Sequence, residues 1–311
     1  MSQAEPLPLP RVSMPVATAL VLLASVGFGL VPFFARSLTD GGMAAPAVAL
    51  WRYALGALIF LPVVWAARRH GSALAWGFGG GFAVGVGWIF YVQALAVLPV
   101  AVVGVVYMTF PAFALLFSWM LFGERPSPRG IVAAGVVLLA AALASGRTAL
   151  AGDHGWTLAL ALMSPATFGL AISILVHRLT ALPVMARLGA FSLGSTLGLA
   201  PLVATLPAAA VLPPDAAALW LVAGIALGTA LVPQLLYTFF APVVGSARAA
   251  TAGAIELPVM ILAGWLMLGE NVSAPQWLAC AMIAGAIALS PSRKVRGPTV
   301  TAVTAPKEPR R

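Results

Sequence analysis

Two residues with formal charges, Arg52 and Glu256, lie within long apolar stretches of the sequence. If these stretches are helices that cross a bilayer, a rise of about 1.5 Å per residue places Arg52 roughly 10–12 Å and Glu256 roughly 13–15 Å from one end of its helix. An ionised side chain at the bilayer centre costs about 2.5–3.5 kcal/mol or more, so such residues normally face a protein interior and have a partner. We therefore predict that both residues belong to an interior binding site.

The carboxyl of Glu256 can bind either a proton or a cationic group. Competition between the two for one carboxyl is a sufficient mechanism for proton-coupled exchange. A guanidinium such as that of Arg52 favours a carboxylate, so the two residues together suit a zwitterion such as an amino acid. The alternative is structural: Glu256 in a hydrogen bond or an ion pair, with Arg52 as one candidate partner, and Arg52 joining helices through backbone carbonyls.

Tyr107 and Thr109 precede a proline, Pro111, that falls inside an apolar stretch. Thr109 stands two residues before Pro111, as Glu256 stands two residues before Pro258, which makes Thr109 a candidate cavity hydroxyl. Proline removes a helical hydrogen bond and frees a carbonyl, and broken helices at the bilayer midplane often line binding sites. The alternative is that both prolines only kink a packed helix.

Two further pairs, Trp88 with Tyr91 and Gln234 with Tyr237, are each spaced by three residues and therefore share one face of a helix. These side chains would either line a cavity or form the aromatic belt at the membrane–water interface. The candidate binding residues are thus Glu256, Arg52, Tyr91, Trp88, Tyr107, Thr109, Gln234 and Tyr237.

The elements that must position these residues follow from the composition. The chain is 61% hydrophobic and 8% charged, with a mean hydropathy of +1.02, which excludes an ordinary soluble globule and a disordered chain. Helices that cross a membrane need about 20 apolar residues and satisfy their own backbone groups. Ten such blocks occur, at 14–34, 45–67, 74–96, 100–122, 129–146, 156–176, 184–206, 217–240, 247–268 and 274–290. We predict an all-α integral membrane protein with ten transmembrane helices; fusing two blocks near Pro99 would give nine.

The positions of Lys and Arg predict the orientation. When ten spans are counted with the N-terminus in the cytoplasm, Arg52 lies within a span, and Arg36 and Arg147 are the basic residues that fall outside the cell. All other Lys and Arg fall on the cytoplasmic side, as the positive-inside rule requires. We therefore expect a multi-pass protein of the inner membrane with both termini in the cytoplasm.

The sequence also contains an internal repeat. Trp119 and Glu124 recur as Trp265 and Glu270, each 146 residues later. Because each half has five spans, an odd number, the second copy is expected to be inverted relative to the first. The predicted divisions are a cytoplasmic tail (1–13), two five-helix repeats (14–148 and 154–291) and a basic, disordered cytoplasmic tail (292–311). Inverted repeats are typical of secondary transporters, with the substrate site near the midplane where the halves meet.

The paired motifs carry a family resemblance. Pro111 followed by Phe122-Gly123-Glu124-Arg125, and Pro258 followed by Leu268-Gly269-Glu270-Asn271, resemble the EamA-type members of the drug/metabolite transporter superfamily. In the first span, Val26-Gly27 stands where the family usually has Trp-Gly. The resemblance implies alternating-access transport of metabolites, amino acids or drugs without an ATPase.

We therefore expect a secondary transporter for a small metabolite, most simply an exporter, with proton coupling as a further hypothesis. The alternatives are a membrane-embedded lipid-modifying enzyme, which would need clustered acids, bases or metal ligands, and a channel or scaffold that does not transport. The histidines are scattered and there is one cysteine, Cys280, so no metal or other cofactor is predicted. The expected partners are the substrate, protons and membrane lipids, not nucleic acid; a monomer and a homodimer both remain open.

Overall fold

Long apolar helices make up the part of the protein that the computed structural model describes, residues 12–125, 155–244 and 255–278. No strand occurs within these ranges. Seven helical segments there are long and apolar enough to cross a membrane: Met14–Asp40, Ala45–Ala66, Arg68–Val97, Val100–Phe122, Gly155–Arg178, Val184–Val203 and Ala216–Phe240. They coincide with seven of the ten predicted blocks. The block 129–146 and most of 274–290 lie outside the described residues, and 247–268 is described only as the helix Glu256–Leu268.

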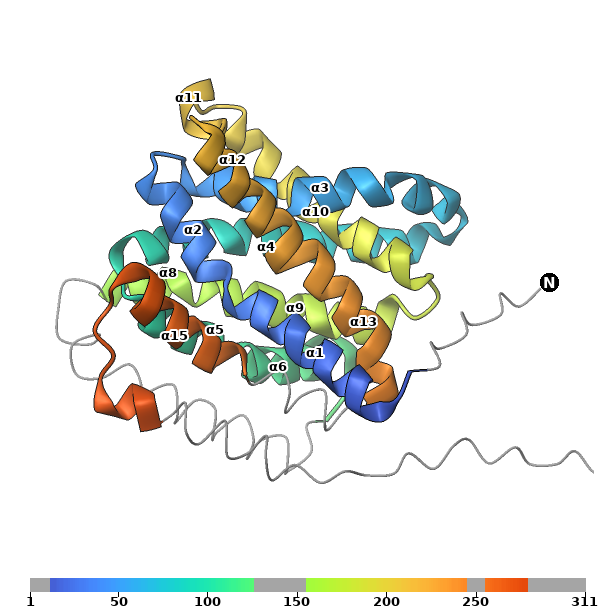
Figure 1. Cartoon of the computed structure of the whole chain (residues 1–311). Coiled ribbons are helices and arrows are strands. Elements are labelled where there is room, and N and C mark those ends of the chain that lie inside the picture. The colour runs from blue at the N-terminus through green and yellow to red at the C-terminus, as the bar shows by residue number, and fades with distance from the viewer. Residues whose placement is uncertain (1–11, 126–154, 245–254, 279–311) are drawn as a thin grey trace, which may run out of the picture.

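Several spans are built from two helices joined at a break. The element order is α1 (Met14–Gly29), α2 (Val31–Asp40), α3 (Ala45–Ala66), the short 3-10 turn η1 (Arg68–His70), α4 (Gly71–Val97), α5 (Val100–Tyr107) and α6 (Phe110–Phe122). It continues with α8 (Gly155–Ala161), α9 (Met163–Arg178), α10 (Val184–Val203), α11 (Ala208–Val211), α12 (Ala216–Ala223), the π-helical segment η2 (Gly224–Leu231), α13 (Val232–Val244) and α15 (Glu256–Leu268). Figure 1 shows the long helices packed side by side.

Proline positions explain two of the helix starts. Pro32 stands in the first turn of α2 and Pro111 in the first turn of α6, where a missing backbone N–H costs nothing because these N–H groups have no partner within the helix. The predicted break near Pro111 is therefore present, between α5 and α6. Pro258 likewise lies near the start of α15.

Glycines let α4 and α10 approach until their backbones touch. A Cβ atom on Gly81 would lie 2.2 Å from the carbonyl oxygen of Phe191, and one on Gly194 would lie 2.2 Å from that of Phe78. The hydroxyl of Ser195 donates to the carbonyl of Gly81 at 2.9 Å across this contact. The glycine spacing in α4 therefore serves the close helix approach that small residues allow in membranes.

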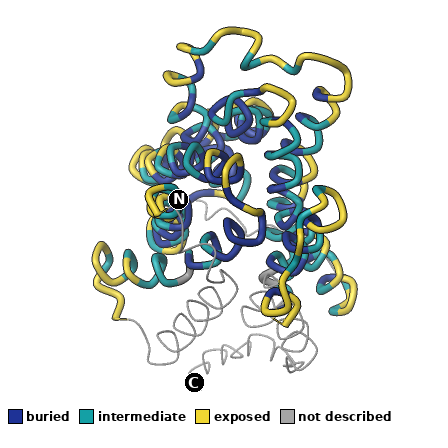
Figure 2. Tube along the Cα trace, turned by 90° about the vertical axis from the view of Figure 1, so that its left-hand side faces the viewer, coloured by how far each residue is buried: buried dark blue, intermediate teal, exposed yellow. Residues whose placement is uncertain are grey.

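Burial separates an apolar outer surface from a core that includes polar groups (Figure 2). Trp65, Leu58 and Leu266 are each more than two-thirds exposed, which suits contact with lipid chains rather than water. Arg52, Thr229 and Ser192 are buried instead. These three polar side chains thus face the interior of the bundle.

The helices α6 and α15 correspond closely. Their first residues and their last residues are each 146 positions apart, and both helices have 13 residues. Both end at a glycine in the left-handed region, Gly123 with φ 69° and Gly269 with φ 67°, a conformation that residues with a Cβ adopt at a cost. A glutamate, Glu124 or Glu270, follows each glycine.

Candidate functional site

Arg52 enters the interior from the middle of α3 and is 8% exposed. Its Nη1 donates to the hydroxyl oxygen of Thr229 at 2.6 Å, and its guanidinium carbon lies 4.3 Å from the centre of the Trp88 ring. The Nε atom is buried without a hydrogen-bond partner. Arg52 is therefore held in place but keeps a donor available, and an unpaired buried donor is energetically costly.

Thr229 comes from the π-helical segment η2 and is fully buried. Its hydroxyl donates to the carbonyl of Ile225 at 2.7 Å, so its oxygen presents a lone pair to Arg52. Wider π-helical turns occur frequently at functional sites because they re-aim side chains. The segment thus places against Arg52 an acceptor that the sequence pattern does not predict.

Arg52 forms no ion pair in the described part of the chain. The ion pairs found there join Arg36 to Glu270 and, when the imidazole is protonated, His177 to Glu124. The direct Arg52–Glu256 contact that was one structural alternative is thus not present in this structure. Arg52 instead packs on the rings of Trp88 and Tyr53, which provide a favourable but uncharged environment for a cation.

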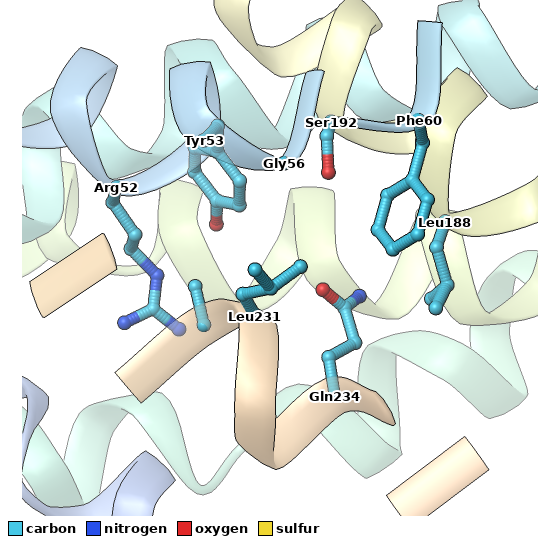
Figure 3. Close-up of a pocket in the computed structure, with 9 residues that line it drawn as sticks. Arg52, Tyr53, Gly56, Phe60, Leu188, Ser192, Leu231 and Gln234 are labelled. Atoms are coloured by element: carbon cyan, nitrogen blue, oxygen red, sulfur yellow. The ribbon is translucent and has the colours of Figure 1, made fainter. Parts of the chain in front are cut away.

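A small cavity adjoins Arg52 (Figure 3). Its volume is about 10 Å³, room for about one water molecule. The hydroxyls of Tyr53 and Ser192 and the amide of Gln234 point into the same space. The full lining is Arg52, Tyr53, Gly56, Phe60, Leu188, Ser192, Ala230, Leu231 and Gln234. Of the predicted residues, Arg52 and Gln234 therefore share this cavity.

A wall of aromatic rings continues from Arg52 toward the break between α5 and α6. The ring centres of Trp88 and Tyr91 are 4.8 Å apart, those of Tyr91 and Tyr107 5.5 Å, and those of Tyr107 and Phe168 5.6 Å. Trp88, Tyr91 and Tyr107 are all buried. The structure thus brings these three predicted residues together inside the bundle, not in an interfacial aromatic belt.

Glu256 is the first residue of α15 and is half-buried. Its carboxylate has no hydrogen bond or ion pair with any described residue, although it interacts electrostatically with Arg52, Tyr91 and Tyr107. Tyr237 also interacts electrostatically with Glu256. The carboxylate and the guanidinium therefore belong to one polar interior without touching each other.

The two remaining predicted residues take more local roles. Thr109 is buried, and its hydroxyl donates to the carbonyl of Val106 at 2.7 Å, within its own turn. Tyr237 packs edge-on against Phe28, with ring centres 6.3 Å apart. Tyr53, Ser192 and Thr229 were not predicted from the sequence; Tyr53 could have been found as the neighbour of Arg52, but no spacing points to the other two.

A bundle of apolar spans around an interior with opposite charges and an aromatic wall defines a multi-pass membrane protein. Residues 16–146 match the EamA-like transporter family. The resemblance expected from the sequence motifs is thus confirmed over residues 16–146, which are similar to an EamA-like transporter unit.

A solved crystal structure has a similar fold. It is 23% identical in sequence, and the match covers 89% of this chain and 98% of that one with a TM-score of 0.57. At this identity the likeness concerns the fold alone. No curated protein matches the chain.

Proposed function

We propose that the protein is a secondary transporter that moves a small zwitterionic metabolite, such as an amino acid, through the bundle by alternating access. The observation that carries this proposal is the pair of opposite interior charges, Arg52 and Glu256, which do not pair with each other. A substrate carboxylate would accept hydrogen bonds from Arg52, including its unused Nε, and a substrate ammonium would pair with Glu256. Charge-assisted hydrogen bonds of this kind are the strong ones.

The aromatic wall suits the rest of such a substrate. Trp88, Tyr91 and Tyr107 present ring faces and edges that pack against apolar groups and attract an ammonium. The cavity beside Arg52 adds the neutral hydrogen-bonding groups of Tyr53, Ser192 and Gln234. These features favour a solute with a charged head and a compact, largely apolar side chain.

The size of that cavity supports alternating access. Pockets that hold small ligands usually measure several hundred cubic ångströms, whereas the cavity beside Arg52 measures about 10 Å³. The helices around Arg52 must therefore separate before a metabolite can bind. The matching helices α6 and α15 support two halves that exchange roles in this motion, as inverted repeats do.

We further propose export across the inner membrane, with both termini in the cytoplasm and a proton as the exchanged ion. The distribution of Lys and Arg supports the orientation. The carboxyl of Glu256 supports the exchange, because it can release a substrate ammonium when it takes up a proton. An exporter of this kind would use the inward proton gradient.

Counterflow in proteoliposomes tests the substrate class. Proteoliposomes that contain the purified protein are loaded with unlabelled compound. The uptake of each amino acid of a radiolabelled panel is then measured. We expect neutral amino acids with apolar side chains to exchange, and their analogues that lack either the amine or the carboxylate to compete at least tenfold less well. Equal competition by either analogue would contradict the zwitterion site, and flux without saturation or counterflow would identify a channel.

Two substitutions in the same assay test the two charged residues of the site. Arg52→Gln and Glu256→Gln should each raise KM about tenfold or more, because each removes a charge from a charge-assisted hydrogen bond. The residual exchange in Glu256→Gln should no longer be driven by a pH gradient. Arg68→Gln, which changes an exposed arginine just after α3, is the matched control and should transport normally. Full transport by Glu256→Gln with an unchanged response to pH would contradict proton coupling.

A further inference from the structure

The glutamates of the repeated motif, Glu124 and Glu270, have no part in the proposed binding site. Each follows the left-handed glycine that ends its helix, α6 or α15. The sequence alone indicates caps or interfacial contacts for such positions. In the structure, each also forms an ion pair with a base on another span: Glu270 with Arg36, and Glu124 with His177 when its imidazole is protonated.

The first ion pair, Arg36–Glu270, joins the middle of α2 to the ends of α4, α5 and α15. The guanidinium of Arg36 also donates to the carbonyls of Leu95, at 2.9 Å, and Leu98, at 2.6 Å, where α4 ends. Both carboxylate oxygens of Glu270 accept from the N–H of Val100, at 2.9 and 3.0 Å, where α5 begins. The guanidinium of Arg36 thus lies at the C-terminus of α4, and the carboxylate of Glu270 lies at the N-terminus of α5. Each charge is opposite in sign to the adjacent end of the helix dipole, so both contacts are favourable.

The second ion pair, Glu124–His177, lies at the end of α6. The Nε2 atom of His177 is 3.0 Å from the carboxylate of Glu124, and Nδ1 is 2.8 Å from the carbonyl of Ser173. Both partners are acceptors, so both contacts are hydrogen bonds when the ring carries two protons. The imidazole also stacks on Phe122, with ring centres 4.4 Å apart and planes within 7°.

The two pairs lie at opposite ends of one membrane-crossing segment. Val100, which contacts Glu270, begins the segment, and Phe122, which contacts His177, ends it. The segment has 23 residues, a length of about 34 Å at 1.5 Å per residue, which matches the hydrocarbon core of a bilayer. One pair therefore lies at each end of this segment.

The surrounding helix contacts are reciprocal. A Cβ atom on Gly29 would meet Val259 and the carbonyl oxygen of Glu256, and one on Gly169 would meet Phe113 and the carbonyl oxygen of Phe110. The positions 256 and 259 are each 146 residues after 110 and 113. The first span thus packs on α15 in the way that α9 packs on α6. Arg36 follows its glycine by seven residues and His177 follows its own by eight, two helical turns in each case.

We propose that the ion pairs Arg36–Glu270 and Glu124–His177 are the two closures of the transport path, which open alternately. Breaking one pair opens the interior to one side of the membrane while the other pair keeps the opposite side shut. The inference rests on the proposed transport function but not on its substrate. With both pairs formed, both ends are shut, in agreement with the small cavity beside Arg52.

The two closures differ in strength. The side chains of Arg36 and Glu270 are 17% and 14% exposed, whereas those of His177 and Glu124 are 23% and 62% exposed. Water screens the more exposed pair more strongly. By the distribution of Lys and Arg, the Arg36–Glu270 end is expected to face the outside. The closure at that end is therefore the tighter of the two.

Thiol accessibility from each side of the membrane tests this proposal without a substrate. Ser192, which lines the interior cavity, is replaced by cysteine in a Cys280→Ala background. Its labelling by a membrane-impermeant maleimide is then followed in right-side-out and inverted vesicles. Glu270→Gln should speed labelling at least fivefold from the outside, and Glu124→Gln should speed it at least fivefold from the inside.

The matched controls change a similar side chain near the same end of the bundle, but one that belongs to neither ion pair. Asp40→Asn neutralises an exposed acid at the end of α2, four residues from Arg36, and His70→Gln replaces an exposed histidine in η1; neither should alter labelling. Arg36→Gln and His177→Gln should act like their partners' substitutions, which keeps the test decisive if one variant fails to fold. Monodisperse elution in detergent establishes folding for each variant.

The proposed closures would be contradicted if both glutamate variants sped labelling from the same side, or if folded variants did not speed it at all. In that event, intact zwitterion counterflow would leave the proposed function standing. If the two variants sped labelling from opposite sides but the protein showed no zwitterion counterflow, the closures would be right and the substrate class wrong.

Discussion

At the scale of single residues, the site is organised around a guanidinium that is fixed by its neighbours but incompletely bonded. Thr229 accepts from Nη1 of Arg52, Trp88 lies beneath the guanidinium, and Nε has no partner. Thr229 does not itself need to touch the substrate. It acts as a positioning residue that aims the free donor.

This role predicts a graded response to substitution. Thr229→Val keeps the volume of the side chain but removes the acceptor, so Arg52 should lose its orientation and KM should rise about tenfold, equivalent to about 1.4 kcal/mol. Thr229→Ser keeps the hydroxyl and should restore near-normal KM, with Vmax little changed in both variants. The measurement is concentration-dependent counterflow; equal KM values for the valine and serine variants would show that the hydroxyl does not position Arg52.

The sequence identified Arg52 and Glu256 because a charge inside an apolar stretch is conspicuous. It identified Trp88, Tyr91 and Tyr107 because of their spacing and their place before a proline. It did not identify Thr229, which is 177 residues from Arg52 along the chain and forms an ordinary part of an apolar block. Contacts of this kind depend on how distant helices pack, which hydropathy patterns do not record.

At the scale of elements, the close approach of α4 and α10 determines where Ser192 and the cavity lie. Gly81 and Gly194 are the positions where the two backbones leave no room for a Cβ atom. Because the neighbouring atoms are backbone atoms, the helices themselves would have to move apart to admit one. This close crossing therefore requires residues without a Cβ atom at both positions.

We predict that Gly81→Ala and Gly194→Ala each destabilise the folded protein by about 1–3 kcal/mol, the usual cost of overpacking. Thermal unfolding in detergent measures the effect. Gly79→Ala is the control on the same helix, because a Cβ atom there meets nothing within 4 Å. If all three variants melted at one temperature, close backbone contact would not be what holds α4 to α10.

The sequence predicted the apolar spans well and their interruptions less well. Seven predicted blocks coincide with helical segments, because length and hydropathy alone select a membrane-crossing helix. The first span continues to Asp40, beyond the predicted end at residue 34, and it breaks after α1. The π-helical turn of η2 was not predicted either, since neither interruption changes the apolar pattern of its block.

At the scale of the whole molecule, the described spans and the distribution of Lys and Arg together predict which loops face which side. Reporter fusions after residue 42 and after residue 206 should be active outside the cytoplasm, and fusions after residue 69 or at the C-terminus should be active inside. Alkaline phosphatase and green fluorescent protein give the two readouts. An external C-terminus would refute the ten-span arrangement, which the described residues support for seven spans.

The Arg36–Glu270 contact also bears on how the protein is made. Its two residues are 234 positions apart. Because a ribosome adds about 5–20 residues per second, Glu270 is synthesised roughly 10–50 s after Arg36. During that interval the nascent first half has no acid to complete this junction. Biogenesis would therefore seal this end of the bundle late, after nearly the whole chain has left the ribosome.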